Sequence, residues 1–387
     1  MRTKVRRKQT RAGTRWYVAV VDENGEHYHG GHRTQKEARA AAANLVVDGR
    51  RGRYVAPGRL TVAEYLEGEW LPSRENADIS PNTKDVERIM VRAWILPHIG
   101  HISLQKLAAL DIDRLYTTLR ARGGRGGTPL RGKSVRNVHV LLSKALGDAV
   151  RRGHRVASPA AAVDPPAKDD SVEREAWSRD EVRAFLDVAG GDRLHAVWRM
   201  ALTTGLRRGE LVGITWDALE DRTIEVRRQV LIRPDGGRGR VYVRETTKGR
   251  RPRRVRIDEQ TAAALRRWKA EQGEERLAYG APWKTDGGLG IEAAWVVTEP
   301  GGELVQPDTL LARWKRLVKM AAVTPIGLHG ARHSYATLAR RAGVLLEIVS
   351  RQLGHASIAT TGDIYSHDDD EAAAEAAQLV AQTLEGR

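Results

Sequence analysis

The sequence predicts a multidomain α+β protein that is mainly helical and carries small β-sheets. Near the N terminus, two β-rich runs flank an Asn-Gly dipeptide. The middle of the chain repeats apolar residues at spacings of three and four, and the C-terminal half mixes helical and strand-like segments. The predicted domains are a sheet with one helix at 1–58, an all-helical domain at 60–165, and a mixed domain with a C-terminal tail helix at 171–387.

The first part, 1–58, is expected to form a hairpin and then a helix. Its β-rich runs lie on either side of Asn24-Gly25, a dipeptide that favours a type I′ turn. Thr34 and Glu37 have the spacing of a capping box before an Ala-rich stretch. The segment is strongly basic, and its histidines alternate along a polar strand with no thiolate or carboxylate to complete a coordination set. We therefore expect a small DNA-binding module without a metal.

The second part is expected to be helical throughout. Its amphipathic segments are 60–74, 80–100, 108–123 and 134–153. Between the last two, Gly127 to Ser134 matches the phosphate-loop pattern of Gly, four residues and Gly-Lys-Ser. A phosphate loop needs a buried strand before it, and a helical segment stands there instead. We expect a loop that connects two helices, with Ser134 as the cap of the second helix. Lys133 remains a candidate DNA-phosphate contact. The Pro-rich stretch 157–170 is then expected to be a linker.

The overall composition favours a polyanionic partner. The 387 residues include 65 Lys and Arg against 49 Asp and Glu, which gives a net charge of +16. Such an excess is typical of nucleic-acid binding. The chain has no cysteine, which excludes disulfides and thiolate metal sites. No window has the apolar length of a membrane span, and no apolar stretch follows the basic N terminus. We expect a cytoplasmic protein, associated with the nucleoid when it is bound to DNA, and no membrane contact.

The third part contains the residues that could take part in a reaction. Arg207 follows Thr-Gly at an apparent break between two helices, and Glu210 comes one turn later on the same face, where it can orient a guanidinium. An exposed Arg-Glu pair at this spacing is usually worth little, so the pair alone is weak evidence. Lys248 precedes Gly249 between two strand-like runs, either as a solvated turn lysine or as a proton donor or phosphate contact.

A later helix, within 327–343, brings histidine and arginine together. His329, Arg332 and His333 stand at positions i, i+3 and i+4. Two histidines four apart also occur in zinc proteases, but that motif needs Glu after the first histidine, and this chain has Gly330. The predicted chemistry is therefore proton transfer beside a phosphate-binding arginine, with neither a metal nor another cofactor.

The order Arg, Lys, His-x-x-Arg, His and Tyr resembles the tyrosine recombinase (phage integrase) family. The motifs that carry the resemblance are "TGLRRGEL", "TKGRRPRRV", "LHGARHSYAT", "QLGH" and "TTGDIYSH". By layout alone, the helical part looks like the core-binding domain of that family, and 1–58 is similar to its arm-binding domains. The catalytic residues that the resemblance implies are Arg207, Lys248, His329, Arg332, His355 and the nucleophile Tyr365.

The resemblance implies a metal-independent and ATP-independent DNA strand transferase. Tyr365 would form a 3′-phosphotyrosyl link, His329 would take the proton of the tyrosine, and Lys248 would protonate the leaving 5′-oxygen. The two arginines would clamp the phosphate, and His355 would donate a hydrogen bond to it. Glu210 and His333 would support the site. The expected partners are double-stranded attachment sites and three further copies of the chain in a tetramer on DNA. A directionality factor or a DNA-bending protein is a candidate accessory partner.

Rival functions remain at this point. A chromosome-dimer resolvase shares the chemistry but usually lacks the first part, and a type IB topoisomerase works as a monomer. A catalytically dead regulator would have lost some of the active residues. The acidic tail 368–387 is either a solvated face or a segment that packs on a neighbouring protomer. Candidate DNA contacts are Arg15, Arg33, Lys133, Arg136 and Arg250.

Overall fold

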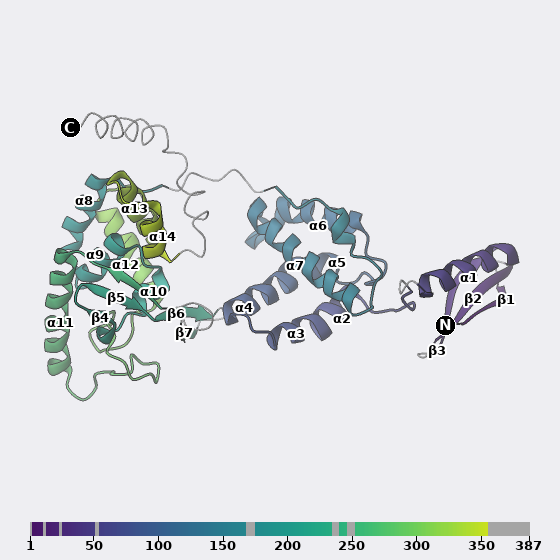
Figure 1. Ribbon diagram of the computed structural model, residues 1–387, viewed down its shortest axis with the longest axis horizontal. Coiled ribbons are helices and arrows are strands. Elements are labelled where there is room, and N and C mark those ends of the chain that lie inside the picture. Colours follow the sequence, from purple (N-terminus) through teal and green to yellow (C-terminus); the bar gives the residue numbers. More distant parts are fainter. Residues whose placement is uncertain are drawn as a thin grey trace, which may run out of the picture. The chain divides into compact units, whose positions relative to one another are not determined.

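The computed structural model describes residues 2–10, 13–22, 25–50, 54–167, 175–233, 240–245 and 252–354. The chain forms two compact units, Met1–Ser171 and Val172–Arg387 (Figure 1). Within these ranges the architecture is mainly helical with three small antiparallel sheets, which confirms the predicted α+β class. Among the described residues, no helix combines the length and the apolar character that a membrane crossing requires.

The first unit begins with a three-stranded antiparallel sheet covered by one helix. The elements are β1 (Arg2–Thr10), β2 (Gly13–Asp22), β3 (Gly25–His32) and α1 (Gln35–Arg50). Val18 and Val20 lie on the same face of β2. They pack on Ala38 and Ala42, which are one turn apart on α1. The predicted hairpin and helix are confirmed.

Two details of this sheet differ from the prediction. Strand β1 was not expected, because its only apolar side chain is Val5 and its pairing with β2 depends on backbone hydrogen bonds. In the hairpin, Asp22 pairs with Gly25, so the connecting residues are 23 and 24, one position earlier than predicted. Both of those residues lie outside the described part of the chain.

The first helix of this unit is capped nearly as its sequence predicts. The Thr34 Oγ1 accepts a hydrogen bond from the Glu37 N–H at 3.2 Å. The Glu37 carboxylate accepts a bond from the Arg33 N–H at 3.0 Å, one residue before the expected donor. The Glu37 N–H is one of the backbone groups that a helix start leaves unpaired, so its bond to Thr34 helps to determine where α1 begins.

The helical part of the first unit matches all four amphipathic segments. Its helices are α2 (Val62–Tyr65), α3 (Leu71–Glu75), α4 (Pro81–Ile89), α5 (Leu96–Ile99), α6 (Ala109–Arg122) and α7 (Gly132–Arg151). Wider turns at Leu66–Trp70 and Met90–Ile95 join α2 to α3 and α4 to α5. Their apolar faces form one core that also buries Tyr65 and Trp70. The boundary between this part and 1–58 stays a prediction.

Two expectations for this part were wrong. Ser134 does not cap α7, because the helix begins at Gly132 and the N-cap is Arg131. The Pro-rich stretch is not a free linker along its whole length. Pro159–Ala162 forms a short helical turn, and Ala160 and Val163 are buried in the helical core. Two buried apolar side chains and hydrogen bonds from Arg120 and Arg136 to the carbonyl oxygens of Ala167 and Pro166 hold this segment on the helical part.

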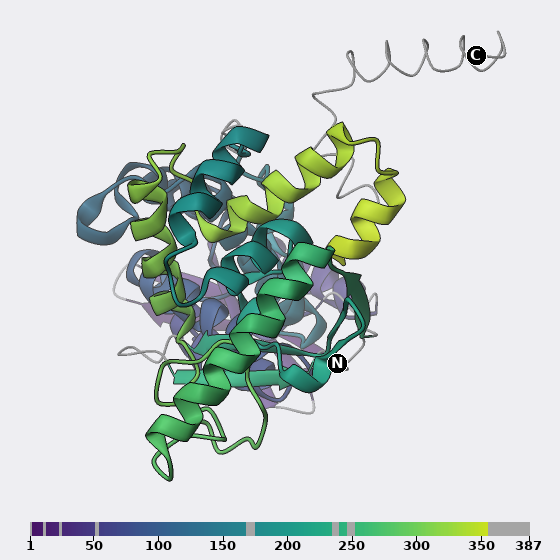
Figure 2. The same ribbon diagram turned by 90° about the vertical axis from the view of Figure 1, so that its left-hand side faces the viewer.

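The second unit surrounds small sheets with helices. Its helices are α8 (Arg179–Ala189), α9 (His195–Thr204), α10 (Arg208–Val212), α11 (Glu259–Tyr279), α12 (Pro307–Met320), α13 (Leu328–Arg341) and α14 (Leu346–Leu353). One sheet has the order β4 (Leu219–Glu220), β5 (Thr223–Val226), β8 (Arg253–Arg256), and the other pairs β6 (Arg228–Arg233) with β7 (Arg240–Glu245). Figure 2 shows α13 and α14 together on one side of this unit.

An aromatic cluster lies at the centre of the second unit. The ring of Trp314 stacks on Trp177 with centroids 5.2 Å apart and meets Phe185 at 4.5 Å. The indole N–H groups of Trp177 and Trp314 donate to the carbonyl oxygens of Thr324 and Ile326. Because these carbonyls belong to the segment just before α13, the cluster fixes the start of the helix that carries His329, Arg332 and His333.

Candidate active site

The junction between α9 and α10 places the first candidate residue. Helix α9 ends at Thr204, and its C-cap residue Gly205 has a left-handed φ of 62°. A Cβ at this position would lie 2.6 Å from Leu353 Cδ2 and 2.8 Å from Tyr335 Cδ1. Both the backbone conformation and the close approach of α13 and α14 therefore require glycine. The chain then turns, and Arg207 becomes the N-cap residue of α10, as the predicted helix break implied.

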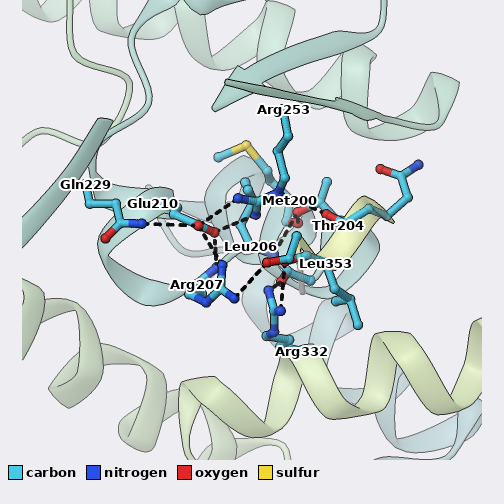
Figure 3. A network of polar contacts seen from close by, with 12 residues as sticks. Met200, Thr204, Leu206, Arg207, Glu210, Gln229, Arg253, Arg332 and Leu353 are labelled. Carbon is cyan, nitrogen blue, oxygen red and sulfur yellow. Dashed lines mark hydrogen bonds and ion pairs between the residues drawn. The ribbon is translucent and has the colours of Figure 1, made fainter. Parts of the chain in front are cut away.

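A buried carboxylate organises the arginines of this junction (Figure 3). The Glu210 side chain is 1% exposed. It accepts hydrogen bonds from the N–H and the Nη1 of Arg207, both at 2.9 Å. Arg253 donates from Nη1 and Nη2 to its two oxygens, at 2.7 and 2.6 Å, and Gln229 Nε2 lies 3.4 Å away. The predicted pairing of Arg207 with Glu210 is present, but it is part of a larger network.

The carboxylate stays ionised in spite of its burial. Burial alone would raise the pKa of Glu210, since it disfavours the charged form. The hydrogen bonds and charge of Arg253, then the charge and backbone N–H of Arg207, outweigh this effect and lower the pKa to about 2. At neutral pH the site therefore holds a fixed negative charge between two guanidinium groups.

The second candidate arginine reaches the same place from another helix. Arg332 lies on α13 and is 3% exposed. Its Nη1 donates to the Gly205 carbonyl oxygen and its Nη2 to that of Leu353, each at 2.8 Å. Arg207 Nη2 donates to the next carbonyl, that of Gly354, at 3.2 Å. Two arginines far apart in the sequence thus converge on the C-terminal end of α14 (Figure 3).

The two histidines of α13 are in contact. The rings of His329 and His333 are 4.9 Å apart and nearly perpendicular, at 89°. Gly330, which stands where the zinc-protease motif has Glu, lies close to Ile326, since a Cβ at this position would lie 2.7 Å from Ile326 Cβ. Within the described ranges, no group of three or more His, Asp or Glu side chains could hold a metal ion.

Four predicted site residues cannot be placed. They are Lys248, Arg250, His355 and Tyr365, and they lie outside the described residues. Their sequence neighbours are placed, since β7 ends at Glu245, β8 begins at Arg253 and α14 ends at Leu353 with Gly354 in a left-handed conformation. A helix that ends in a left-handed glycine therefore stands just before His355.

The remaining predicted DNA contacts belong to the first unit. Arg15 lies in β2, opposite Lys8 of β1, and Arg33 precedes α1 at an exposed position. Lys133 is exposed in the first turn of α7, whereas Arg136 donates to the Pro166 carbonyl oxygen at 3.1 Å.

No strand precedes Gly127 between α6 and α7, which agrees with our rejection of a phosphate loop.

Sequence reasoning missed two members of the arginine network, Arg253 and Gln229. Arg253 is in phase with the buried residue Val255 of β8 and with Ile257, which follows the strand, while Arg254 and Arg256 are exposed. An arginine on the buried face of a strand needs a partner, so this alternation was the available signal. Gln229 carries no comparable signal, because a polar residue in a strand is usually exposed.

Comparison with known proteins agrees with this geometry. The phage integrase family matches residues 177–372. A tyrosine recombinase XerC-like protein of Caldanaerobacter subterraneus subsp. tengcongensis is 26% identical over 376 residues, which cover 92% of this chain and 93% of the relative. The class that these observations define is the tyrosine site-specific recombinase. More particularly, the chain belongs to the phage integrase family.

Solved structures have the same fold. A Tn1549 transposon integrase in complex with a circular intermediate DNA has a TM-score of 0.67 and 21% identity, and covers 83% of this chain and 99% of its own. A lambda integrase tetramer bound to a Holliday junction has a TM-score of 0.57 and 16% identity, and covers 90% and 92%.

Proposed function

We propose that this chain is a DNA integrase that cuts and rejoins attachment sites through a covalent tyrosine intermediate. The observation that carries the proposal is the convergence of Arg207 and Arg332 on the adjacent carbonyl oxygens of Gly354 and Leu353. This arrangement holds two fixed positive charges at the point where the chain continues to His355. Two preorganised guanidinium groups suit the non-bridging oxygens of a phosphodiester.

The arginine pair supplies the electrostatic part of the reaction. When the phosphorus becomes pentacoordinate, negative charge builds up on its equatorial oxygens, and the guanidinium groups of Arg207 and Arg332 stabilise it. Glu210 accepts one hydrogen bond from the Arg207 backbone N–H and one from its guanidinium, which holds the guanidinium in place before the reaction. This role needs neither a metal nor a nucleotide.

The covalent step uses Tyr365. Its phenol oxygen attacks phosphorus, forms the P–O bond of a 3′-phosphotyrosyl link and breaks the bond to the 5′-oxygen. A free tyrosine has a pKa of about 10, so it needs a base at neutral pH. His329 accepts the phenol proton and returns it when the 5′-hydroxyl of the other strand reverses the step. The phosphotyrosyl bond retains the energy of the broken bond, so rejoining needs no ATP.

The leaving group and the phosphate need further donors. Lys248 protonates the departing 5′-oxygen, and His355 donates a hydrogen bond to the phosphate. His333 supports His329 through the ring contact on α13. The phenol proton therefore passes to His329, and the proton on the 5′-oxygen comes from Lys248; both transfers reverse when the strand is rejoined.

The partners follow from this reaction. Strand exchange joins two duplexes, so we propose a homotetramer on double-stranded attachment sites, like the lambda integrase tetramer seen on a Holliday junction. Arg15, Arg33, Lys133, Arg136 and Arg250 are the proposed DNA contacts. The acidic tail would link neighbouring protomers. A directionality factor or a DNA-bending protein completes the assembly, which acts in the cytoplasm on the nucleoid.

An integrase is favoured over a chromosome-dimer resolvase by the N-terminal sheet and helix. This basic module precedes the helical part, and the exposed side chains of β1 include Arg2 and Lys8. A second DNA-binding surface of this kind suits arm-type sites beside the crossover site. The chromosome-dimer resolvase is the alternative function.

The experiment that tests the function works without a known DNA site. The protein is produced in cells that contain a genomic library. The cells are lysed in denaturant, the protein is purified, and the DNA that remains covalently attached to it is sequenced. We expect attached 3′ ends that share one sequence, together with recombined junctions at that sequence. Attachment spread over many sequences, with supercoil relaxation and no junctions, would indicate a topoisomerase. No attached DNA at all would contradict a covalent enzyme.

The choice between integrase and resolvase needs a second comparison. A variant that lacks residues 1–58 is compared with the full chain on the recovered site, with and without its flanking DNA. If the protein is an integrase with arm-type sites, the shortened variant should lose recombination of the flanked substrate but keep cleavage of the short site. Equal recombination by both proteins would favour the resolvase.

A further inference from the structure

Arg253 occupies a central place in the polar network around Glu210. It is the first residue of β8, and its side chain is 17% exposed. Nη1 and Nη2 form a two-pronged pair with the Glu210 oxygens at 2.7 and 2.6 Å. The third nitrogen, Nε, donates to the Gln352 carbonyl oxygen at 3.1 Å. Every nitrogen of this guanidinium therefore has a protein acceptor.

Together with the two arginines of the site, Arg253 completes a regular pattern at the end of α14. The carbonyl oxygen of Gln352 accepts from Arg253, that of Leu353 from Arg332, and that of Gly354 from Arg207. The last carbonyl groups of a helix lack partners within the helix and lie at the negative end of its dipole. Three arginines from three different elements thus satisfy three consecutive carbonyls.

The end of α14 also rests directly on Arg253. Gly354 has a φ of 66°, and a Cβ there would lie 2.8 Å from Arg253 Cδ and 3.0 Å from its Cζ. A second link joins the same elements, because the Arg256 N–H donates to Gln352 Oε1 at 3.3 Å. Strand β8 itself is held by β5, where Arg253 pairs with Val226. The sheet therefore supports the helix end through this side chain.

We propose that Arg253 is a positioning residue of the recombinase site. It holds Glu210 against Arg207 and fixes the turn from which the chain continues to His355. The inference depends on the proposed function, because it assigns Arg253 to the same reaction. Each of its three nitrogens donates to Glu210 or to Gln352, so we assign this side chain to holding these groups in place rather than to the phosphate clamp.

The test compares Arg253→Met with Arg254→Met, its neighbour in the strand. Arg254 is a suitable control because its side chain is 70% exposed and its ion-pair partner Glu220 is 3.8 Å away. Both variants are measured for DNA affinity and for single-turnover formation of the covalent adduct on a nicked substrate. We expect Arg253→Met to bind DNA within about 2-fold of wild type and to cleave about 10²-fold more slowly, as expected when catalytic groups are misplaced by about 1 Å.

The pH profile separates positioning from general loss of structure. The charged and polar groups that face Glu210 are Arg207, Arg253 and Gln229, with Arg244 bonded to Gln229. Without Arg253, the carboxylate of Glu210 loses its strongest partner and its pKa rises. As the pH is lowered, cleavage by Arg253→Met should therefore decline at a higher pH than cleavage by wild type. Arg254→Met should follow the wild-type profile. An unchanged rate and profile in Arg253→Met overturns the proposal.

Two further variants keep the test decisive. If Arg253 acts through Glu210, the double variant Arg253→Met with Glu210→Gln should cleave no more slowly than the slower single variant, whereas additive losses would contradict this route. If Arg253→Met does not fold, Arg253→Lys keeps the charge but loses the two-pronged geometry, and it should still cleave at least about 10-fold more slowly. Wild-type cleavage by Arg253→Lys would overturn the proposal, and absence of a wild-type adduct would instead refute the proposed function.

Discussion

The guanidinium of Arg332 donates to the carbonyl oxygen of Gly205 at 2.8 Å, which joins α13 to the turn that precedes Arg207. The same guanidinium binds Leu353 at the end of α14. The Arg332 side chain therefore connects helix α13, the turn before Arg207 and the end of helix α14. These bonds lie beside the apolar cluster that packs α13 on α14, and single substitutions at them should have measurable effects.

The first prediction concerns the turn at Gly205. We expect Gly205→Ala to lower the free energy of unfolding by about 2 kcal/mol, because its left-handed backbone disfavours a Cβ and the Cβ would overlap Leu353 and Tyr335. Gly273→Ala is the matched control, since Gly273 lies within α11 and a Cβ there meets no atom within 4 Å. Unfolding in urea, followed by tryptophan fluorescence, measures both. A Gly205→Ala protein as stable as the control would show that the turn tolerates a side chain.

The second prediction concerns the pH dependence of stability. The pKa of Glu210 is lowered from 4.5 to about 2, so its stabilising effect is present above the unfolded pKa and is lost as pH falls toward 2. Between pH 5 and pH 3, wild type should lose about 2 kcal/mol more unfolding free energy than Glu210→Gln. Glu271→Gln, at an exposed position of α11, should behave like wild type. Parallel curves for wild type and Glu210→Gln would contradict the lowered pKa.

The third prediction concerns Arg332. Lysine cannot reach the carbonyl oxygens of Gly205 and Leu353 together, so Arg332→Lys leaves a buried acceptor unpaired. We expect a loss of about 1–3 kcal/mol in stability and about 10²–10³-fold in single-turnover cleavage, with DNA affinity nearly unchanged. Arg316→Lys is the control, because Arg316 is 65% exposed on α12. Cleavage by Arg332→Lys at the wild-type rate would remove Arg332 from the site.

Much of the fold could be predicted because amphipathic periodicity reports burial directly. The helices between 60 and 153 follow their apolar spacing, and the break before Arg207 follows from Thr-Gly. Strand β1 could not be predicted in this way, because it contributes backbone hydrogen bonds and almost no apolar surface. The start of α7 was also misjudged, since its N-cap residue, Arg131, makes no side-chain cap bond and gives no signal in the sequence.

The candidate site was predictable for a different reason. Arg207, Glu210 and Arg332 belong to short motifs whose order is informative, and the structure joins them around α14. Arg253 was missed because a charged residue in a basic run is ordinarily solvated. Its alternation with Val255 and Ile257 indicated the face on which it lies, but its contacts with Glu210 and Gln352 are evident only in the structure. Contacts between distant segments of this kind are not encoded in local spacing.

The central claim is that Tyr365 is the nucleophile, and a nicked suicide substrate tests it most directly. The substrate carries the recovered attachment site with a nick that lets the short cleaved strand diffuse away, so a covalent protein–DNA adduct accumulates. Wild type should form an adduct that resists denaturant and carries DNA through its 3′ end, whereas Tyr365→Phe should bind the same DNA and form none. A Tyr365→Phe protein that still forms the adduct would contradict the assignment of the nucleophile.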